Sequence, residues 1–222
     1  MNRVLHPGMT DQVSDASESD SRIMLGLLEA LESDKPQSQR SLASELGIAL
    51  GLVNAYLKRC VNKGLVKVRE APARRYAYYL TPLGFAEKSR LTVEYLSYSF
   101  GFFRQAKADC SRLFQLANAR GIKHVVLAGQ SDLAEIATFC APEHAIEIVG
   151  LVDPDSKDDR FVGLPVFANF DSVSRPFDAV LITDLVKARE ISEAVVARFG
   201  AQRVLLPELL RVRIGEPREA QP

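Results

Sequence analysis

The residues of this sequence whose types and spacing best suit a chemical role lie in the run VVLAGQSDLAEIA at residues 125–137. Nucleotide-binding loops carry the pattern G-x-G-x-x-G directly after a strand, and this chain has Gly129, Ser131 and Ala134 at those positions. Gly129 allows the tight turn, Ser131 is small enough to let a phosphate approach the backbone, and Ala134 permits close packing of helix on strand. The run therefore predicts a phosphate cradle at the start of a helix.

Further residues complete the predicted nucleotide site. Asp153 ends the next apolar stretch, 24 residues after Gly129, where an acid that accepts a hydrogen bond from a ribose hydroxyl is expected. Two more residues follow a later apolar stretch and would close the other side of the crevice. The expected ligand contacts are Gly129, Gln130, Ser131, Asp132, Leu133, Asp153, Thr183 and Asp184. The alternative is that Gly129 only shapes a strand-to-helix turn and that Asp153 caps a loop.

Metal binding and catalysis have weaker candidates. No Cys or His stands at metal-ligand spacing from the three cysteines, so we expect no metal and interpret them as reduced, buried small residues: Cys60, Cys110 and Cys140. His124 stands at the entry to a strand, His144 lies in a loop, and Ser131 has no histidine partner in a recognisable motif. We therefore expect no catalytic residues and no enzymatic activity.

The charge of the chain is unevenly distributed, although its formal net charge is zero. Residues 35–120 hold 15 Lys and Arg against 5 Asp and Glu, whereas residues 1–34 hold 2 against 7 and residues 121–222 hold 11 against 16. A strongly basic middle block between two acidic ones is typical of a protein with a polyanionic partner for that block alone. The alternative is a solvated charged surface.

Hydrophobic spacing predicts three helices near the N-terminus. Residues 1–19 lack periodicity and are interpreted as a disordered lead-in, whereas apolar residues recur at three- and four-residue steps from Ser21 onward. A second helix is expected between the cap Ser38 and Gly47, and a third over residues 48–64. A helix, a short turn with glycine and another helix form a helix-turn-helix arrangement.

The next segment predicts a wing. Residues 65–70 and 75–80 alternate with period two and are joined by Ala-Pro-Ala, which indicates a β-hairpin. Helices and hairpin together predict a winged helix-turn-helix domain over residues 20–82. Arginines crowd the expected wing tip, where a DNA backbone would lie: Arg69, Arg74 and Arg75. The alternative is a plain hairpin with solvating arginines.

Residues 21–90, with the runs SQRSLASELGIALGLVNAYLKRCVNKGLVKV and YAYYLTPLGFAEKSRLT, resemble the MarR-type winged helix-turn-helix of regulators associated with exopolysaccharide gene clusters. The resemblance implies that the third helix enters the major groove of duplex DNA, with Lys58 and Arg59 towards phosphates. Asn54 is the residue there able to make a bidentate contact with adenine. The predicted DNA contacts are Ser38, Gln39, Ala49, Leu50, Gly51, Asn54, Lys58, Arg69, Arg74 and Arg75.

Residues 83–120 are predicted to form a helical connector with two apolar stripes. One stripe is Leu91, Tyr95, Tyr98 and Phe102, and the other is Phe103, Ala106, Cys110, Leu113 and Ala117. Gly101 falls where the stripes change over, so we expect a bend or two separate helices. Because helix-turn-helix modules need two half-sites for useful affinity, we interpret the stripes as a homodimer interface. The alternative is packing between domains of one chain.

Residues 121–213 alternate between strand and helix patterns, and residues 214–222 are interpreted as a tail. Strands are expected at 124–129, 146–154, 164–170, 177–184 and 203–207, with helices at 131–143 and 188–200. Continuous runs of Val, Ile and Leu indicate strands covered on both faces, which predicts a doubly wound, mostly parallel sheet. The expected fold class is α/β overall, with an N-terminal winged helix-turn-helix, a helical connector and a C-terminal Rossmann-like domain.

The runs VVLAGQSDLAEIA, IEIVGLVDPD, GLPVFANFDSV, FDAVLITD and GAQRVLLPELLRV resemble the CoA-binding-type Rossmann fold. That fold occurs in Rex-type redox repressors and at the front of sugar acyltransferases, where it holds a nucleotide sugar. The resemblance implies a nucleotide-type ligand, with NAD(H) and a nucleotide sugar as the two cofactor candidates. The alternative is an empty scaffold for oligomerisation or protein contact.

These patterns together predict a cytoplasmic, homodimeric transcriptional regulator that binds double-stranded DNA, senses a nucleotide-containing ligand and controls polysaccharide genes. No stretch is apolar and long enough to span a membrane, and the N-terminal residues lack the hydrophobic core of a signal peptide. The alternative functions are a regulator with a ligand-free oligomerisation scaffold and a nucleotide-sugar-binding component of an enzyme.

Overall fold

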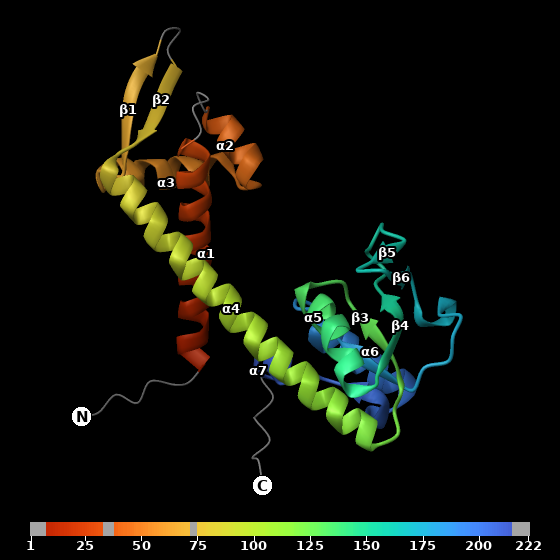
Figure 1. The fold of residues 1–222 in the computed structure, drawn as a ribbon. Helices are drawn as coiled ribbons and strands as arrows, with labels where there is room; N and C mark the ends of the chain where they lie inside the picture. The colour runs from red at the N-terminus through yellow and green to blue at the C-terminus, as the bar shows by residue number, and fades with distance from the viewer. Residues whose placement is uncertain (1–7, 33–37, 72–74, 215–222) are drawn as a thin grey trace, which may run out of the picture. The chain divides into compact units, whose positions relative to one another are not determined.

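The computed structural model describes the backbone of residues 8–32, 38–71 and 75–214. The chain divides into two compact units, Met1–Ser99 (unit 1) and Phe100–Pro222 (unit 2). One long helix, α4 (Pro82–Ala119), contributes its first part to unit 1 and its second part to unit 2 (Figure 1).

Unit 1 combines helices with a two-stranded hairpin. Before α4 its elements are α1 (Gly8–Glu32), α2 (Gln39–Leu46), α3 (Leu50–Asn62), β1 (Val66–Ala71) and β2 (Arg75–Leu80). The hydroxyl of Ser38 caps α2 by accepting a hydrogen bond from the backbone N of Ser41. Gly47 ends α2 with a φ of 62°, a left-handed conformation that suits glycine. Both predicted ends of this helix are confirmed.

The core of unit 1 forms where the apolar faces of the first three helices meet. Its fully buried side chains include Leu27, Leu28, Leu42 and Val53. Helix α3 directs a stripe at helical spacing into this core: Val53, Tyr56, Leu57 and Cys60. Leu52 and Val61 of the same helix are exposed at 40% and 38%. The opposite face of α3 is therefore open.

Thr81 fixes the hairpin to the start of α4. Its backbone N donates to the carbonyl oxygen of Leu65 at 3.0 Å, and its hydroxyl donates to the carbonyl oxygen of Gly64 at 2.7 Å. The same hydroxyl accepts from the backbone N of Gly84 at 3.1 Å and so caps α4. A Cβ added at Gly84 would meet the carbonyl carbon of Leu65 at 3.1 Å and would clash with its oxygen. The approach of α4 to the hairpin therefore requires glycine at this position.

Unit 2 is built around a sheet with the strand order β5-β6-β4-β3-β7-β8. The strands are β3 (His124–Ala128), β4 (Glu147–Val152), β5 (Arg160–Phe161), β6 (Leu164–Phe167), β7 (Ala179–Ile182) and β8 (Val204–Leu205). The helices after α4 are α5 (Asp132–Cys140), α6 (Ala188–Phe199) and α7 (Glu208–Ile214). All neighbouring strands pair in parallel except β5, which is antiparallel to β6. The predicted mostly parallel sheet is confirmed.

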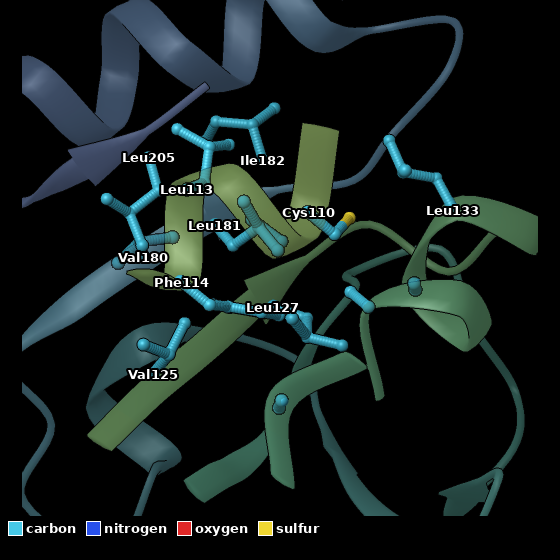
Figure 2. Packing of buried hydrophobic residues seen from close by; sticks show 14 of the residues in the cluster. Cys110, Leu113, Phe114, Val125, Leu127, Leu133, Val180, Leu181, Ile182 and Leu205 are labelled. Atoms are coloured by element: carbon cyan, nitrogen blue, oxygen red, sulfur yellow. The ribbon is translucent and has the colours of Figure 1, made fainter. Parts of the chain in front are cut away.

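Both faces of this sheet are covered, as the continuous apolar strands require. Alternate residues of β3 serve opposite faces, since Val125 and Leu127 join one buried cluster and Val126 joins another. In the larger cluster Phe114 of α4 packs with Leu127 of the central strand (Figure 2). The C-terminal part of α4 is therefore a core element of unit 2.

The start of α1 differs from the prediction. Residues 8–19 are helical and extend α1, whereas the sequence predicted a disordered lead-in up to residue 19. After Gly8 no proline or glycine interrupts the chain until Gly26. Nothing in the segment therefore stops the helix. The first part of the predicted lead-in, residues 1–7, lies outside the described residues.

Helix α4 corrects two further predictions. It runs through Gly101 without interruption, because a glycine in a helix interior costs only about 1 kcal/mol relative to alanine and packing outweighs this. The second of the two stripes predicted as a dimer interface is used inside the chain, since four of its members are buried in unit 2: Ala106, Cys110, Leu113 and Ala117. Phe103, the fifth member, is 46% exposed. The sequence also missed β5 and α7, which are too short for a clear periodicity, and α7 includes residue 214 of the predicted tail.

Candidate functional site

The N-terminal half of α3 presents an exposed face. Leu50, Asn54 and Lys58 are spaced four residues apart on the side opposite the buried stripe, and all three are exposed. Ala49 and Gly51 are also exposed, and a Cβ added at Gly51 would meet no atom within 4 Å. The structure therefore brings five of the predicted DNA contacts onto one open surface.

Two other predicted contacts have roles within the fold. The hydroxyl of Ser38 caps α2. The side-chain Nε2 of Gln39 donates to the hydroxyl of Tyr78 on β2 at 2.9 Å and so links α2 to the wing. These contacts position the helix-turn-helix, and the DNA-contacting role of both side chains stays a prediction.

Arg59, expected to point towards phosphates, binds a carboxylate of α1 instead. Its Nη1 lies 2.7 Å and 3.0 Å from the two carboxylate oxygens of Asp20, which also accepts from the hydroxyl of Tyr56 at 2.5 Å. The Tyr56 hydrogen bond, aided by Arg59, lowers the pKa of Asp20 below its ordinary value. Burial, followed by the contact with Asp20, raises the pKa of Tyr56 to about 12. This cluster joins α1 to α3 across 39 residues of sequence, which no local pattern reveals.

The wing presents basic and aromatic side chains. The guanidinium carbon of Arg69 lies 5.7 Å from the centre of the Tyr79 ring, and Lys67, on the same strand as Arg69, is exposed. Sequence reasoning missed Lys67 and Tyr79, although strand alternation places them beside Arg69. The predicted contact Arg74 lies outside the described residues. Arg75 begins β2, but the position of its side chain is not among the described features.

In unit 2 the predicted ligand contacts do come together. Ser131 caps α5 after β3, Asp153 follows β4, and Thr183 follows β7, so they meet at the carboxyl ends of three neighbouring parallel strands. The switch point of the strand order lies between β3 and β7. The backbone of Leu133 takes part in α5, but its side chain is fully buried in the core. Asp132 is exposed in the first turn of α5.

The loops on the two sides of the switch point are bonded to each other. The hydroxyl of Ser131 donates to the carbonyl oxygen of Thr183 at 2.6 Å, and the buried hydroxyl of Thr183 donates to the carbonyl oxygen of Gly129 at 2.6 Å. Gly129 has a φ of 102°, and a Cβ there would lie 2.7 Å from the Cα of Asp184. The turn glycine thus permits a close approach of two protein loops.

The two acids at this edge of the sheet, Asp153 and Asp184, also have hydrogen-bond partners. The carboxylate of Asp153 accepts from the backbone N of Gln130 at 2.8 Å and of Asp155 at 3.0 Å. Asp184 accepts from the backbone N of Val186 at 2.7 Å and of Lys187 at 2.6 Å. The side chain of Gln130 bonds to the loop after β4 rather than pointing into free space. A ligand at this edge would exchange these bonds for its own.

Across residues 8–32, 38–71 and 75–214, no three His, Cys, Asp or Glu side chains gather as a metal ion would require. None of the helices described there is both long and apolar enough to cross a membrane.

Comparison with known families identifies the class of the N-terminal domain. Residues 20–67 match the family described as winged helix-turn-helix DNA-binding. This match spans α2 and α3 and reaches into β1, the elements that carry the open face described above. The N-terminal part of the chain is therefore a winged helix-turn-helix DNA-binding domain, as the sequence predicted. No curated protein sequence matches the chain.

Solved structures of two kinds are similar to parts of the chain. The PcaV transcriptional regulator from Streptomyces coelicolor is 21% identical over 47% of this chain and 84% of its own, with a TM-score of 0.36. A MarR family transcription regulator is 20% identical over 51% of this chain and 83% of its own, with a TM-score of 0.36. Human N-acetylserotonin methyltransferase in complex with SAM is 14% identical over 82% of this chain and 72% of its own, with a TM-score of 0.29.

The similarity to methyltransferases concerns the prediction that the chain has no enzymatic activity. The sequence led us to expect a chain without enzymatic activity, and the similarity to SAM-dependent methyltransferases over most of the chain contradicts that expectation. The expectation is therefore withdrawn. The TM-scores of these matches, from 0.27 to 0.32, assign no activity or substrate to this chain.

Proposed function

We propose that this chain is a transcriptional regulator of the MarR type that reads duplex DNA with α3. The observation that carries the proposal is the open face of α3, where Leu50, Asn54 and Lys58 lie in line with no core contact. In this arrangement the amide of Asn54 bonds an adenine edge, Lys58 meets a phosphate, and the apolar N-terminus contacts thymine methyls. The basic charge of residues 35–120 supplies the electrostatic attraction.

The test of this proposal separates base reading from backbone binding. The full chain is used to select duplexes from a random pool, and affinities for the selected site are then measured by fluorescence anisotropy at several salt concentrations. Asn54→Ala should lose about 1–3 kcal/mol of preference for one adenine position and keep the salt dependence. Lys58→Ala should weaken all duplexes alike and reduce the salt slope by about 1. Asn62→Ala, at the other end of α3, is the matched control and should behave as the wild type. Selection without any enriched sequence, or an unchanged preference in Asn54→Ala, would overturn base reading by α3.

The regulator is proposed to act as a homodimer through α4. Two apolar side chains of α4 within unit 1 lie three residues apart on one side of the helix, and they are 64% and 45% exposed: Val93 and Leu96. Burying such a row against a second copy removes it from water and places two α3 helices on an inverted repeat. Leu96→Glu should give a monomer by light scattering at a concentration where the wild type is dimeric, and Glu94→Gln should not. A monomeric wild type at micromolar concentration would refute the dimer.

Unit 2 is proposed to bind a nucleotide-type ligand at the switch point between β3 and β7. The supporting observation is that Ser131, Asp153 and Thr183 meet there from three separate segments. NAD(H) and a nucleotide sugar are the probes, because a ligand at 100 times its dissociation constant adds about 2.7 kcal/mol to the native state. Calorimetric titration of the wild type and of the Ser131→Arg, Asp153→Ala double variant should show binding to the wild type alone. Equal binding to both proteins, or none to the wild type, would leave this edge of the sheet as a scaffold.

A further inference from the structure

Residues 154–158 form a loop after β4, which we call the strap, and the side chain of Gln130 holds it. The Oε1 of Gln130 accepts from the hydroxyl of Ser156 at 2.8 Å, and its Nε2 donates to a carboxylate oxygen of Asp158 at 3.3 Å. Gln130 follows β3, so the two bonds join segments that are 26 and 28 residues apart in sequence. A single amide therefore uses its acceptor and one of its donors on the same loop.

Lys187 holds the strap from the other side of β3. Its Nζ lies 2.5 Å from a carboxylate oxygen of Asp155. Lys187 follows β7 and Asp155 follows β4, and β3 lies between these two strands in the sheet. The ion pair therefore crosses the carboxyl end of β3, where the chain turns into α5.

The strap keeps its shape through bonds of its own. The backbone N of Asp155 donates to the carboxylate of Asp153 at 3.0 Å, and the backbone N of Asp158 donates to the hydroxyl of Ser156 at 3.2 Å. Every strap residue except Ser156 is exposed, so little apolar surface holds the loop down. The strap can therefore separate from Gln130 and Lys187 without losing its internal turns.

The ammonium group of Lys187 is suited to bind a phosphate in place of a carboxylate. Asp155, aided by Asp184 and Glu190, raises the pKa of Lys187 above its ordinary value, so the side chain is charged at neutral pH. The side chains of Lys187 and Asp155 are 51% and 74% exposed, so water screens their attraction and the carboxylate is easily exchanged. A phosphate carries more negative charge than a carboxylate and offers three acceptor oxygens, which favours it in this exchange.

We propose that the strap closes the ligand site of unit 2 and opens when a phosphate of the ligand takes Lys187 from Asp155. In the closed strap the carboxylate of Asp155 occupies the place of the ligand's anionic group. Lys187 is then the phosphate-binding residue, and Gln130 is a positioning residue that keeps the strap closed. The inference rests on the nucleotide-type ligand proposed for unit 2 and deepens it by naming the residue that receives the phosphate.

Opening of the strap is measured by native proteolysis with a lysine-specific protease, because the strap contains the exposed Lys157. The full chain is digested and cleavage after Lys157 is followed by mass spectrometry. When opening is fast relative to cleavage, the rate follows the population of the open strap. Gln130→Ala, which removes two hydrogen bonds, should raise the rate about 5- to 30-fold. Asp155→Asn, which removes an exposed ion pair, should raise it about 1.5- to 5-fold.

A second exposed ion pair of unit 2 provides the matched control. Asp171 pairs with Arg198, and their side chains are 77% and 44% exposed, close to the values for Asp155 and Lys187. Asp171→Asn should leave cleavage after Lys157 at the wild-type rate. Raising NaCl from ~50 to ~500 mM should speed this cleavage in Asp171→Asn and the wild type but not in Asp155→Asn, whose ion pair is already lost. Melting followed by circular dichroism checks that each variant is folded.

Inorganic pyrophosphate is the probe for the exchange at Lys187. At constant ionic strength it should raise cleavage after Lys157 in the wild type to the rate of Asp155→Asn, about 1.5- to 5-fold. Lys187→Met should show no response to pyrophosphate, because it lacks the ammonium group. Arg198→Met, which removes a comparably exposed cation elsewhere in unit 2, should respond as the wild type does.

The outcomes separate the strap from the function on which it rests. A wild-type cleavage rate in Gln130→Ala would overturn the strap, whether or not unit 2 binds a nucleotide. No acceleration by pyrophosphate in the wild type, or an equal one in Lys187→Met, would overturn the exchange at Lys187. If neither NAD(H) nor a nucleotide sugar binds but pyrophosphate opens the strap through Lys187, the nucleotide assignment fails and the strap stands.

Discussion

Replacing Asp20 by alanine should destabilise unit 1, because this carboxylate is the shared partner of two side chains on α3. It accepts from the hydroxyl of Tyr56 at 2.5 Å and binds Arg59 at 2.7 Å. Tyr56 is only 9% exposed, so its hydroxyl has little access to water once Asp20 is gone. The side chains of Asp20 and Arg59 are 39% and 46% exposed, so solvent screens their attraction.

The expected loss of stability in Asp20→Ala follows from these exposed fractions. An unsatisfied buried hydroxyl costs about 1–3 kcal/mol, whereas an exposed ion pair contributes about 0.2–1 kcal/mol. Alanine is favoured over aspartate within a helix by roughly 0.5 kcal/mol, which offsets part of this loss. Asp20→Ala should therefore lower the free energy of unfolding by about 2 kcal/mol. Tyr56→Phe should cost about 1 kcal/mol and Arg59→Ala less, because each leaves Asp20 with its other partner.

The positions of the tyrosines provide a fluorescence assay for the unfolding of unit 1. The protein has no tryptophan, and all six of its tyrosines lie between residues 56 and 98, within unit 1. Tyrosine emission during urea denaturation of the full chain therefore reports unit 1 alone. Far-UV circular dichroism on the same samples follows both units. An Asp20→Ala midpoint shift seen by circular dichroism but absent from tyrosine emission would contradict the assignment of the cluster to unit 1.

The contribution of Asp20 should depend on pH in a defined direction. Its pKa in the folded state lies below the ordinary value of 3.8, so its stabilising contribution is complete above that value and is lost as pH falls through the folded pKa. The pKa of Tyr56 is raised from 10.0 to about 12, so its contribution is complete below pH 10.0 and is lost as pH rises towards 12. The difference between wild type and Asp20→Ala should be flat from about pH 5 to 9 and shrink outside that range. A difference below ~0.5 kcal/mol at neutral pH would refute the reasoning.

Three other changes test separate parts of the fold. Gly84→Ala should lower the stability of unit 1 by more than ~2 kcal/mol and weaken DNA binding, because a Cβ there collides with the carbonyl of Leu65; wild-type melting would contradict the close approach. Phe114→Ala should cost unit 2 about 3–5 kcal/mol by circular dichroism, since the side chain is fully buried, while urea unfolding followed by tyrosine emission keeps its wild-type midpoint. Burial raises the pKa of Cys110 to about 12, so a thiol reagent at pH 8 should label it only after unfolding; rapid labelling of native protein would show that the packing opens.

Local sequence signals were sufficient to predict a helix whose ends carry capping residues and strands that are continuously apolar. Ser38 and Gly47 bounded α2 because a cap hydroxyl and a left-handed glycine act on their own helix. The parallel strands were recognisable because each is a run of apolar residues buried on both faces. The break at Gly101 was wrong, and one of the two stripes predicted as a dimer interface is buried within the chain, since the sequence shows that a helix face is apolar but not which surface covers it. The prediction for residues 8–19 was also wrong, because their polarity was interpreted as disorder although no proline or glycine interrupts a helix there.

The candidate site was harder to predict, because hydrogen bonds between distant residues decide which groups remain available. The exposed face of α3 follows from helical periodicity, and Asn54 was identified from that alone. The partners of Arg59 and Gln39 lie 39 residues away in each case, so their roles in the fold leave no local signature. The same holds for Ser131, whose bond to Thr183 spans 52 residues. Residue type and spacing predicted which residues meet at the carboxyl ends of the strands but did not reveal how they bond.

The two proposed binding sites differ in how many hydrogen bonds within the protein a ligand must displace. On α3 and the wing, Asn54, Lys58 and Lys67 are exposed, so a DNA duplex gains their contacts with little to displace. At the switch point of unit 2, a ligand between the loops must replace the Ser131–Thr183 bond and a backbone bond to Asp153. Two such bonds are worth about 2 kcal/mol together, which weakens the apparent affinity about 30-fold relative to an open site. An exposed carboxylate at Asp132 in the first turn of α5 further opposes an anionic phosphate there. A ligand of unit 2 is therefore expected to bind more tightly, by at most about 30-fold, to a Ser131→Ala variant, which lacks the bond to Thr183, and equal affinity for this variant and the wild type would show that the bond is not displaced.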